Sequence, residues 1–151
     1  MRPPPISVRS ARRGDRAFIR ELSVQVFSEY TPRAGVRALP MTERRGSVTL
    51  VAEWRGALAG FAVLVLERTR ASLDAIAVSD DARGHGVGRR LLAAVERVAR
   101  ERGVESIELV TADANGAALD LFLRAGFERA RQLKGYYPRG QDAQLLRKKL
   151  R

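Results

Sequence analysis

Residues 73–102 constrain the fold of this chain most strongly, because they predict a strand, a glycine-rich loop and a helix in immediate succession. The run 73–78 is mostly apolar, and residues 89–102 carry apolar side chains on one helical face. Between them, glycines stand at alternate positions 84, 86 and 88. Glycine lets the backbone approach a ligand closely, and the N–H groups of a first helical turn carry partial positive charge. The stretch therefore predicts a site for a phosphate-bearing ligand.

The spacing of the loop excludes two common phosphate-binding motifs. A Walker loop ends in Gly-Lys-Ser/Thr, and a dinucleotide fingerprint is Gly-x-Gly-x-x-Gly near the start of a βαβ unit. Here the pattern is Arg-x-x-Gly-x-Gly, and it stands in the middle of the chain. A loop that is rich in glycine only for steric reasons is the alternative interpretation.

Length and composition predict one domain, formed by residues 6–151 after a disordered, proline-rich tail at 1–5. The chain has 151 residues, of which 45% are apolar, and this is enough for a core of its own. No apolar run approaches the roughly 18 residues of a membrane span, and no hydrophobic segment of a signal peptide follows the first residues. With no cysteine and one histidine, the sequence favours a cytoplasmic protein without disulfides or a metal site.

The formal charge of +11 raises the question of nucleic-acid binding, since phosphate contacts dominate such affinity. The arginines are scattered, however, and aromatic residues make up only 6% of the chain. Neither a recognition helix nor a stacking motif accompanies them. We therefore attribute the charge to scattered surface arginines, as an arginine-biased genome would produce them. Such a surface would still attract polyanions and repel strongly basic substrates at long range.

The other segments predict an ordered series of strands and helices. Strands are expected at 6–9, 48–54, 57–66, 106–111, 127–133 and 144–149. Helices are expected at 16–29, capped by Asp15, and at 115–124, with a short further helix between residues 31 and 46. The strands 48–54 and 57–66 form a hairpin that turns at Arg55-Gly56, and Gly103 ends the helix 89–102.

Three motifs in this order resemble the GNAT acyltransferases, which hold acetyl-CoA. The first is the loop 83–88. The second begins at Asn115, continues through Ala118, Leu121 and Phe122, and closes at Gly126-Phe127. The third, Tyr136-Tyr137-Pro138, is similar to the carboxyl-terminal hairpin of the RimI-like N-terminal protein acetyltransferases. The superfamily resemblance covers residues 6–150.

The resemblance implies an α+β fold with a mixed, mostly antiparallel sheet that is splayed between its fourth and fifth strands and flanked by about four helices. Acetyl-CoA would lie in the gap as co-substrate, where backbone groups lack a cross-strand partner. The strand backbone would bind the pantetheine arm, the loop would bind the pyrophosphate, and two helix residues would complete the site. These residues are Ile76, Ala77, Val78, Arg83, Gly84, His85, Gly86, Val87, Gly88, Arg89, Asn115 and Phe122.

The resemblance also implies a general base on the strand 106–111, for which Glu108 is the candidate. It lies seven residues before Asn115, where the related enzymes have five, and ungapped matching would place Val110 there. Glu108 faces the same side if the two extra residues lie in the loop. A surface glutamate is the alternative, and Asp74 is a second choice as base.

Phe122 stands where the family usually has a tyrosine that protonates the departing thiolate. Tyr136, Tyr137 or a water would have to replace it, unless the thiol, with a pKa of about 8.5, leaves without help. Backbone N–H groups of residues 76–78 would stabilise the charge on the thioester oxygen.

The resemblance thus predicts an acetyl-CoA-dependent N-acetyltransferase that acts on a protein or peptide N-terminal α-amine. A small-molecule amine acetyltransferase and a CoA-binding module with reduced activity are the alternatives. We expect acetyl-CoA and an amine acceptor as partners, no membrane and no nucleic acid, and a monomer or homodimer.

Overall fold

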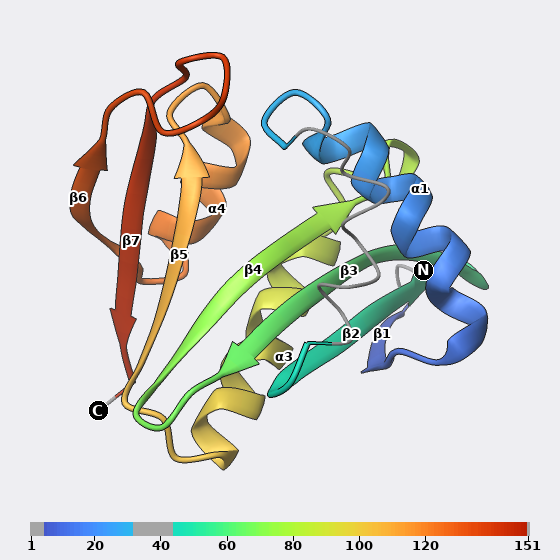
Figure 1. Cartoon of the computed structure of the whole chain (residues 1–151). Coiled ribbons are helices and arrows are strands. Elements are labelled where there is room, and N and C mark those ends of the chain that lie inside the picture. Colours follow the sequence, from blue (N-terminus) through green and yellow to red (C-terminus); the bar gives the residue numbers. More distant parts are fainter. Residues whose placement is uncertain (1–4, 32–43, 151) are drawn as a thin grey trace.

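A computed structural model describes residues 5–31 and 44–150. In these residues seven strands form one sheet in the order β1-β2-β3-β4-β5-β7-β6. Every neighbouring pair is antiparallel except β4 and β5, which are parallel. The sheet opens into two halves that diverge from a common lower end (Figure 1). The predicted splay between the fourth and fifth strands is therefore confirmed.

The first half of the sheet contains β1 (Ile6–Ser10), β2 (Ser47–Trp54), β3 (Ala57–Leu66) and β4 (Arg70–Val78). The turn between β2 and β3 has two residues, Arg55 and Gly56, with φ of 55° and 76°. Positive φ at both positions is the geometry of the tight turn that matches strand twist. The hairpin predicted at this place is confirmed.

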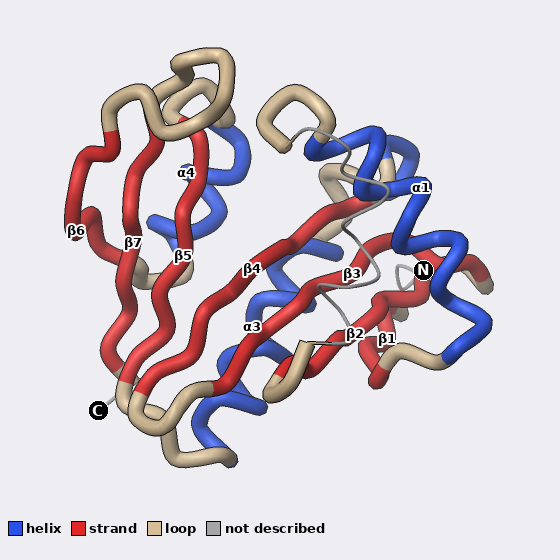
Figure 2. Tube along the Cα trace, viewed as in Figure 1, coloured by secondary structure: helices blue, strands red, loops and turns tan. Residues whose placement is uncertain are grey.

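The second half contains β5 (Ser106–Ala112), β7 (Ala143–Lys149) and β6 (Glu128–Leu133). Helix α3 (Val87–Glu101) connects β4 to β5, as a parallel pair requires, and α4 (Gly116–Arg124) follows β5. The chain therefore crosses from one half to the other through α3 (Figure 2).

Two apolar clusters lie on opposite faces of the sheet. The larger cluster packs the sheet against α3 and α4, with Leu91, Val95 and Phe122 among its buried side chains. The smaller one packs β3 and β4 against α1 (Arg16–Phe27), around Ile19 and Phe61. Burial of these two sets fixes both faces of the first half and leaves the gap between β4 and β5 as the place where the sheet is incomplete.

The structure confirms most element boundaries to within a few residues. Strand β4 begins at Arg70, three residues before the predicted start, and α1 ends at Phe27, two before the predicted end. Three α-helices lie in the described residues, together with short 3-10 turns at Arg13–Asp15 and Asp80–Ala82. The expected further helix falls mainly on 32–43, outside the described residues, as does nearly all of the tail 1–5. None of the helices described is long and apolar enough to cross a membrane.

The predicted capping role of Asp15 is wrong in its side-chain contact. Asp15 precedes α1, but its carboxylate makes no hydrogen bond to the first helical turn. Instead it accepts hydrogen bonds from Arg9 Nη1 and Nη2 at 2.8 and 3.0 Å and from the Arg12 backbone N–H at 2.7 Å. Arg9 also donates to Glu53 Oε1 at 2.7 Å, so this buried carboxylate joins the entry of α1 to β1 and β2.

We expect Asp15→Asn to lower the free energy of unfolding by about 1–3 kcal/mol at pH 7, the usual range for a hydrogen bond to a charged group. Hydrogen bonds from Arg9 hold the pKa of Asp15 below its usual value, against the opposing effect of burial. A depressed pKa gives stability that is present above the unfolded-state pKa of about 3.9 and is lost as the pH falls through the folded-state value.

Urea unfolding of wild type and Asp15→Asn from pH 7 to pH 3.5 checks this. The difference in free energy should be constant above about pH 5 and shrink below pH 4. The control is Asp120→Asn, which removes an exposed ion pair to Arg124 and should change stability by less than about 1 kcal/mol. A pH-independent difference for Asp15→Asn would contradict the assignment.

Candidate active site

The splay begins after three residue pairs of β4 and β5. Pairing runs from Arg70↔Ser106 to Ser72↔Glu108, although β4 continues to Val78 and β5 to Ala112. Residues 73–78 keep β3 on one side, and residues 109–112 keep β7. Between them the backbone groups that face the gap have no strand partner, which is the arrangement that a ligand with matching polar groups would complete.

The glycine-rich loop lies at the open end of β4 and leads into α3. Gly84 and Gly86 have φ of 80° and 88°, which only glycine adopts without strain. Among the described residues, no hydrogen-bond acceptor is recorded for the N–H groups of residues 84–89, and Arg90 N–H is the first to bond, to Gly86 O at 3.0 Å. A Cβ at Gly84 would meet no atom within 4 Å, so the backbone there is open to a ligand.

These features fit the diphosphate of acetyl-CoA. The free N–H groups point away from the helix, the helix N-terminus adds partial positive charge, and the Arg83 and Arg89 side chains add full charges. Within the described residues, Arg83 makes an exposed ion pair to Asp80 at 3.4 Å. When bound, acetyl-CoA would supply the acetyl group as a thioester, and residues 83–89 would hold its phosphates.

Two loop residues also have packing roles. A Cβ at Gly88 would lie 3.2 Å from Leu121 Cδ2 and 3.7 Å from Val78 Cγ2, so this glycine lets α3 approach α4 and β4. The His85 imidazole stacks on the Trp54 indole, with ring centroids 4.4 Å apart. His85 therefore anchors the loop to β2 through its ring, and its backbone remains available to a ligand.

The backbone groups of the three β4 residues expected to bind the pantetheine arm do not all face the gap. The Ala77 carbonyl faces β3, because a Cβ on Gly60 would lie 2.6 Å from it. Since successive residues of a strand point their polar groups to opposite sides, Ile76 and Val78 offer theirs to the gap. The backbone groups of Ile76 and Val78 thus face the gap and those of Ala77 face β3, and binding of the pantetheine arm by Ile76 and Val78 remains a prediction.

The two predicted residues of α4 lie in different surroundings. Asn115 caps the helix, since its Oδ1 accepts from Ala118 N–H at 3.2 Å, and it also lines the cavity described below. Phe122 is 3% exposed and packs edge-on against Phe127, with ring centroids 5.9 Å apart. Its ring belongs to the core between α4 and the sheet and does not line that cavity.

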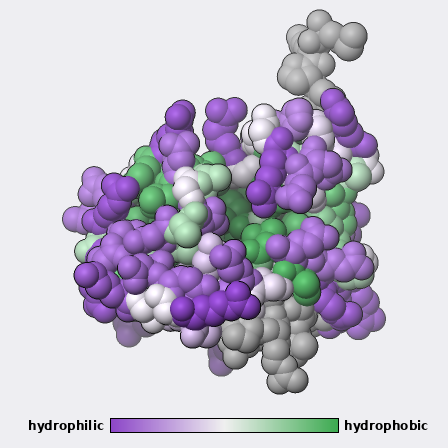
Figure 3. Space-filling view, turned by 90° about the horizontal axis from the view of Figure 1, so that it is seen from above, coloured by the Kyte–Doolittle hydropathy of each residue, from purple (hydrophilic) through white to green (hydrophobic). Residues whose placement is uncertain are grey.

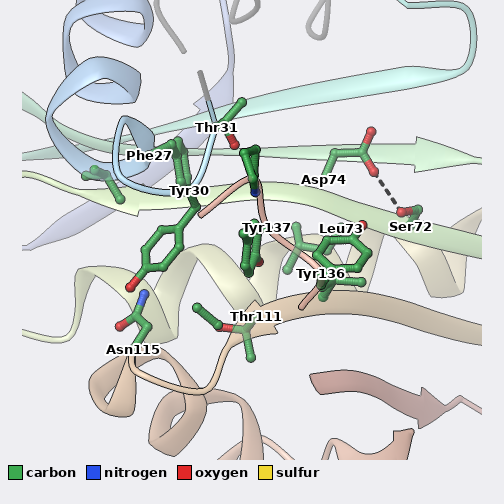
Figure 4. A pocket seen from close by; sticks show the side chains of 14 residues that line it. Phe27, Tyr30, Thr31, Ser72, Leu73, Asp74, Thr111, Asn115, Tyr136 and Tyr137 are labelled. Carbon is green, nitrogen blue, oxygen red and sulfur yellow. Dashed lines mark hydrogen bonds between the residues drawn. The ribbon is translucent and has the colours of Figure 1, made fainter. Parts of the chain in front are cut away.

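A cavity of about 530 Å³ opens at the gap on the side of α1. Its wall combines the end of α1 and the turn after it with residues 72–74 of β4, residues 110–112 of β5 and residues 136–138 of the β6–β7 loop (Figure 4). Seen from above, hydrophobic residues lie in the hollow between the two halves and hydrophilic residues surround it (Figure 3). The cavity therefore has access to both strands that border the splay.

Aromatic side chains close this cavity from opposite halves of the sheet. The rings of Tyr30, after α1, and Tyr137, in the β6–β7 loop, have centroids 5.0 Å apart, as do those of Tyr136 and Tyr137. Gln141 Nε2 donates to Glu29 O at 3.1 Å beside them. The β6–β7 loop therefore bridges the gap that β4 and β5 leave open.

Burial, with smaller effects from Tyr136 and Tyr30, raises the pKa of Tyr137 to about 12. Proton transfer from such a hydroxyl to a thiolate of pKa about 8.5 is uphill by about 5 kcal/mol. The raised pKa thus makes Tyr137 a weaker acid than a free phenol, and whether Tyr136 or Tyr137 protonates the thiolate remains a prediction.

We accordingly expect Tyr137→Phe to raise the KM for the acceptor several-fold while kcat stays within about threefold of wild type. Steady-state kinetics at saturating acetyl-CoA separate the two parameters. Tyr136→Phe, which alters a neighbouring ring that is 53% exposed, is the matched control and should change less. A tenfold or larger loss of kcat in Tyr137→Phe with an unchanged KM would instead support the role of acid.

The two predicted carboxylates lie at different places. Glu108 is paired with β4 at the last position before the splay, and its Oε1 accepts from Arg147 Nε and Nη2 at 2.9 and 2.7 Å. It does not line the cavity, whereas Val110 does. Asp74 lines the cavity, and its Oδ1 accepts from Ser72 Oγ at 2.7 Å. The catalytic role of Glu108 remains a prediction.

Several residues that line or support the site belong to none of the three sequence motifs. Tyr30, Ser72 and Thr111 line the cavity, and Trp54 supports the phosphate loop. The sequence predicts the helix that Tyr30 follows, but it does not predict the contact with Tyr137 that places Tyr30 in the cavity wall. In the part of the chain that the structure describes, no group of three or more His, Cys, Asp or Glu side chains has the geometry of a metal site.

The sheet is splayed between two strands, a glycine-rich loop with free N–H groups follows one of them, and a cavity lies beside the gap. This architecture is that of the acyltransferases that use a CoA thioester. The sequence profile of the Acetyltransferase (GNAT) family matches residues 16–127. The chain belongs to the GNAT family.

Relatives within the family include N-terminal acetyltransferases. The [ribosomal protein bS18]-alanine N-acetyltransferase of Escherichia coli K12 is 35% identical over 83 residues, which are 55% of this chain and 56% of that protein. N-alpha-acetyltransferase 30 of Schizosaccharomyces pombe is 37% identical over 68 residues, 45% of each chain. The matched segment thus spans about half the length of these relatives.

A solved structure extends the similarity over nearly the whole chain. The ribosomal-protein-alanine N-acetyltransferase of Brucella melitensis superposes with a TM-score of 0.81 at 27% identity. The superposition covers 95% of this chain and 99% of that one. The fold described here is therefore shared from the first strand to the last.

Proposed function

We propose that this protein transfers the acetyl group of acetyl-CoA to the α-amine at the N-terminus of a protein or peptide, by direct attack within a ternary complex. The observation that carries the proposal is the end of β4–β5 pairing at Ser72↔Glu108. It places the anion-binding loop and the aromatic cavity at one gap, so that a cofactor and an acceptor can meet there.

The names of the relatives support the acceptor. The Escherichia coli relative is named for acetylating an alanine of a ribosomal protein, and the Schizosaccharomyces pombe relative is named an N-alpha-acetyltransferase. Among the described residues that line the cavity, all side chains but Asp74 are neutral, which suits the end of a chain better than a polyanionic acceptor. A cytoplasmic location belongs to the same proposal, and the oligomeric state, monomer or homodimer, remains a prediction.

The chemistry of the site follows from residues of this chain. One N–H group, of Ile76 or of Val78, would stabilise charge on the thioester oxygen, because both residues border the gap and have no strand partner there. The hydroxyls of Tyr30 and Tyr137 would donate hydrogen bonds within the cavity. Since Phe122 carries no hydroxyl, the departing sulfur would take its proton from the amine or from water.

Incubation with isotopically labelled acetyl-CoA tests the function. The substrates are peptides with free N-termini, the same peptides with blocked N-termini, and a panel of small amines, and the products are identified by mass spectrometry. We expect label at the free N-termini. Label on small amines alone would favour the small-molecule acetyltransferase, and binding of acetyl-CoA without transfer to any amine would favour a CoA-binding module.

A further inference from the structure

Asp74 differs in charge from the other described residues that line the cavity. Among the described residues that line it, Asp74 alone carries a charge at neutral pH, although the whole chain has a formal charge of +11. A carboxylate in a cavity of neutral side chains attracts a cation and repels anions. The acceptor of the proposed reaction arrives mostly as an ammonium ion, because an α-amine has a pKa of about 7.7–8.0.

A β-bulge places this side chain. Val63 of β3 pairs with Ala75 and Leu64 pairs with Leu73, so Asp74 is the extra residue of β4 and has no partner on β3. Bulges re-aim side chains and are frequent beside active sites. Here Leu73 belongs to the core on the α3 side and Ala75 to the core on the α1 side, and Asp74 lies between them at the cavity wall.

The two carboxylate oxygens of Asp74 have partners of different strength among the described residues. Ser72 Oγ donates to Oδ1 at 2.7 Å, the contact drawn as a dashed line in Figure 4, and this fixes the carboxylate on its own strand. Among the described residues, the ion-pair partner of Oδ2 is Arg44 Nη1 at 3.6 Å, whose side chain is 62% exposed. An entering ammonium group could displace Arg44 from Oδ2.

Asp74 also lies at a suitable distance from the phosphate loop. A ligand held at residues 83–88 that follows the free side of β4 passes Val78 first, and Asp74 is four residues further on. At about 3.3 Å per residue this is about 13 Å along the strand. Asp74 is two positions from Ser72, the last residue of β4 that pairs with β5, so a ligand arm of about that length would end beside Asp74.

We propose that Asp74, positioned by Ser72, binds the ammonium group of the acceptor through Oδ2 and removes the proton that makes the amine nucleophilic. This inference rests on the proposed function and assigns the base to β4, where the sequence favours Glu108 on β5. Glu108 Oε1 accepts from Arg147 and Glu108 does not line the cavity, whereas Asp74 lines it and, among the described residues, its Oδ2 has Arg44 Nη1 at 3.6 Å as its ion-pair partner.

The protons and electrons balance as follows. One proton of the ammonium ion passes to Asp74 Oδ2, and the nitrogen lone pair then forms the amide bond to the acetyl carbon. The C–S bond breaks with its electron pair on sulfur, and the second proton of the nitrogen ends on that sulfur. Asp74 releases its proton to solvent, so one acceptor ammonium yields one amide, one thiol and one solvent proton.

The test compares variants on Ala-Gly-Ala-amide at pH 7.0 and pH 9.0, with acetyl-CoA saturating. Asp74→Asn should lower kcat/KM by about 100-fold or more at pH 7.0, the usual effect of a general base. At pH 9.0 the loss should fall to less than about tenfold, because most of the acceptor is then already neutral. Ser72→Ala should show a smaller loss with the same pH dependence.

Arg44→Gln should act in the opposite direction and raise kcat/KM at pH 7.0 about two- to fivefold, because it removes the competing cation. Asp120→Asn, on the outer face of α4, makes the same chemical change far from Asp74 and should match wild type. A purely structural role of Asp74 would not reverse sign between Asp74→Asn and Arg44→Gln.

Other titratable groups at the cavity do not produce this pattern. Tyr30, Tyr136 and Tyr137 face it from the turn after α1 and from the β6–β7 loop. Burial raises the pKa of Tyr30 above its ordinary value and that of Tyr137 to about 12, so both stay protonated at pH 9.0.

Calorimetry gives a readout that needs no turnover. Ala-Gly-Ala-amide should bind the protein loaded with CoA at pH 6.5 at least tenfold more weakly after Asp74→Asn, and its N-acetylated form should bind both proteins equally. The inference is overturned if Asp74→Asn keeps wild-type kcat/KM at pH 7.0, or if its loss is independent of pH and peptide binding is unchanged.

Failure of the proposed function is a separate outcome. If wild type transfers acetyl groups and Asp74→Asn does so equally well, this result contradicts the present inference but not the proposed function. Wild type that transfers to no amine contradicts the function, and the binding measurement then still decides whether Asp74 holds the ammonium group. If Asp74→Asn fails to fold, as judged by thermal unfolding, the opposite effects of Ser72→Ala and Arg44→Gln decide the question.

Discussion

Gly86→Asp is expected to weaken binding of acetyl-CoA by 100-fold or more, whereas Gly86→Asn weakens it by less than about tenfold. A carboxylate at this position lies where the diphosphate approaches the free N–H groups of the loop. Two like charges about 4 Å apart repel by about 4 kcal/mol at an effective dielectric constant of about 20. Asparagine has the same size and adopts the left-handed conformation of Gly86, with φ of 88°, about as readily as aspartate.

Isothermal titration calorimetry with acetyl-CoA measures both affinities, and thermal unfolding checks that both variants fold. Equal affinities of wild type and Gly86→Asp would show that the phosphates bind elsewhere. Gly88→Asp should also abolish binding, but it is a weaker test. Its Cβ would lie 3.2 Å from Leu121 Cδ2, so a change in packing contributes to the result.

A peptide with a free α-amine is expected to be acetylated on the order of 100-fold faster than the same peptide with a blocked N-terminus and a free lysine, compared by kcat/KM at pH 7.5. The reference pKa values of about 7.7–8.0 and about 10.4 make neutralisation of lysine roughly 3–4 kcal/mol more costly. The long-range repulsion from a chain of formal charge +11 acts against lysine-rich peptides as well.

Mass spectrometry of matched peptides with one free amine each measures this ratio. The ratio should narrow as the pH rises toward 9, because the neutral fraction of lysine then grows tenfold per pH unit while that of the α-amine saturates. Faster turnover on the blocked, lysine-containing peptide at pH 7.5 would reverse the ranking and point to a side-chain acetyltransferase.

Local features of the site were predictable because neighbouring residues determine them. The left-handed loop before α3 follows from glycines at 84 and 86, and the two-residue turn of the β2–β3 hairpin follows from Arg55-Gly56. The cap of α4 follows from Asn115, whose side chain reaches a backbone N–H three residues ahead. Such features depend on sterics and hydrogen bonds within a few residues, which a sequence displays directly.

Contacts of side chains from distant segments were less predictable. Asp15 has the sequence of a helix cap, but the Arg9 guanidinium, brought to it by β1, offers the stronger charged hydrogen bonds. Tyr30 and Tyr137 are 107 positions apart in the sequence and form one wall of the cavity. The order of segments along the sequence does not determine which side chains will be in contact in the folded protein.

By itself, the sequence determined that this protein has a strand, a glycine-rich loop and a helix at residues 73–102, and the GNAT fold around them. Only the tertiary structure decided which groups face the gap. Glu108 and Val110 lie on the same side of β5, but pairing with Arg147 and the point of the splay separate Glu108 from the cavity. Asp74 reaches it through a bulge in β4. Strand register and bulges are set by pairing between distant segments and by burial of both faces, so they become definite only when the whole sheet has formed.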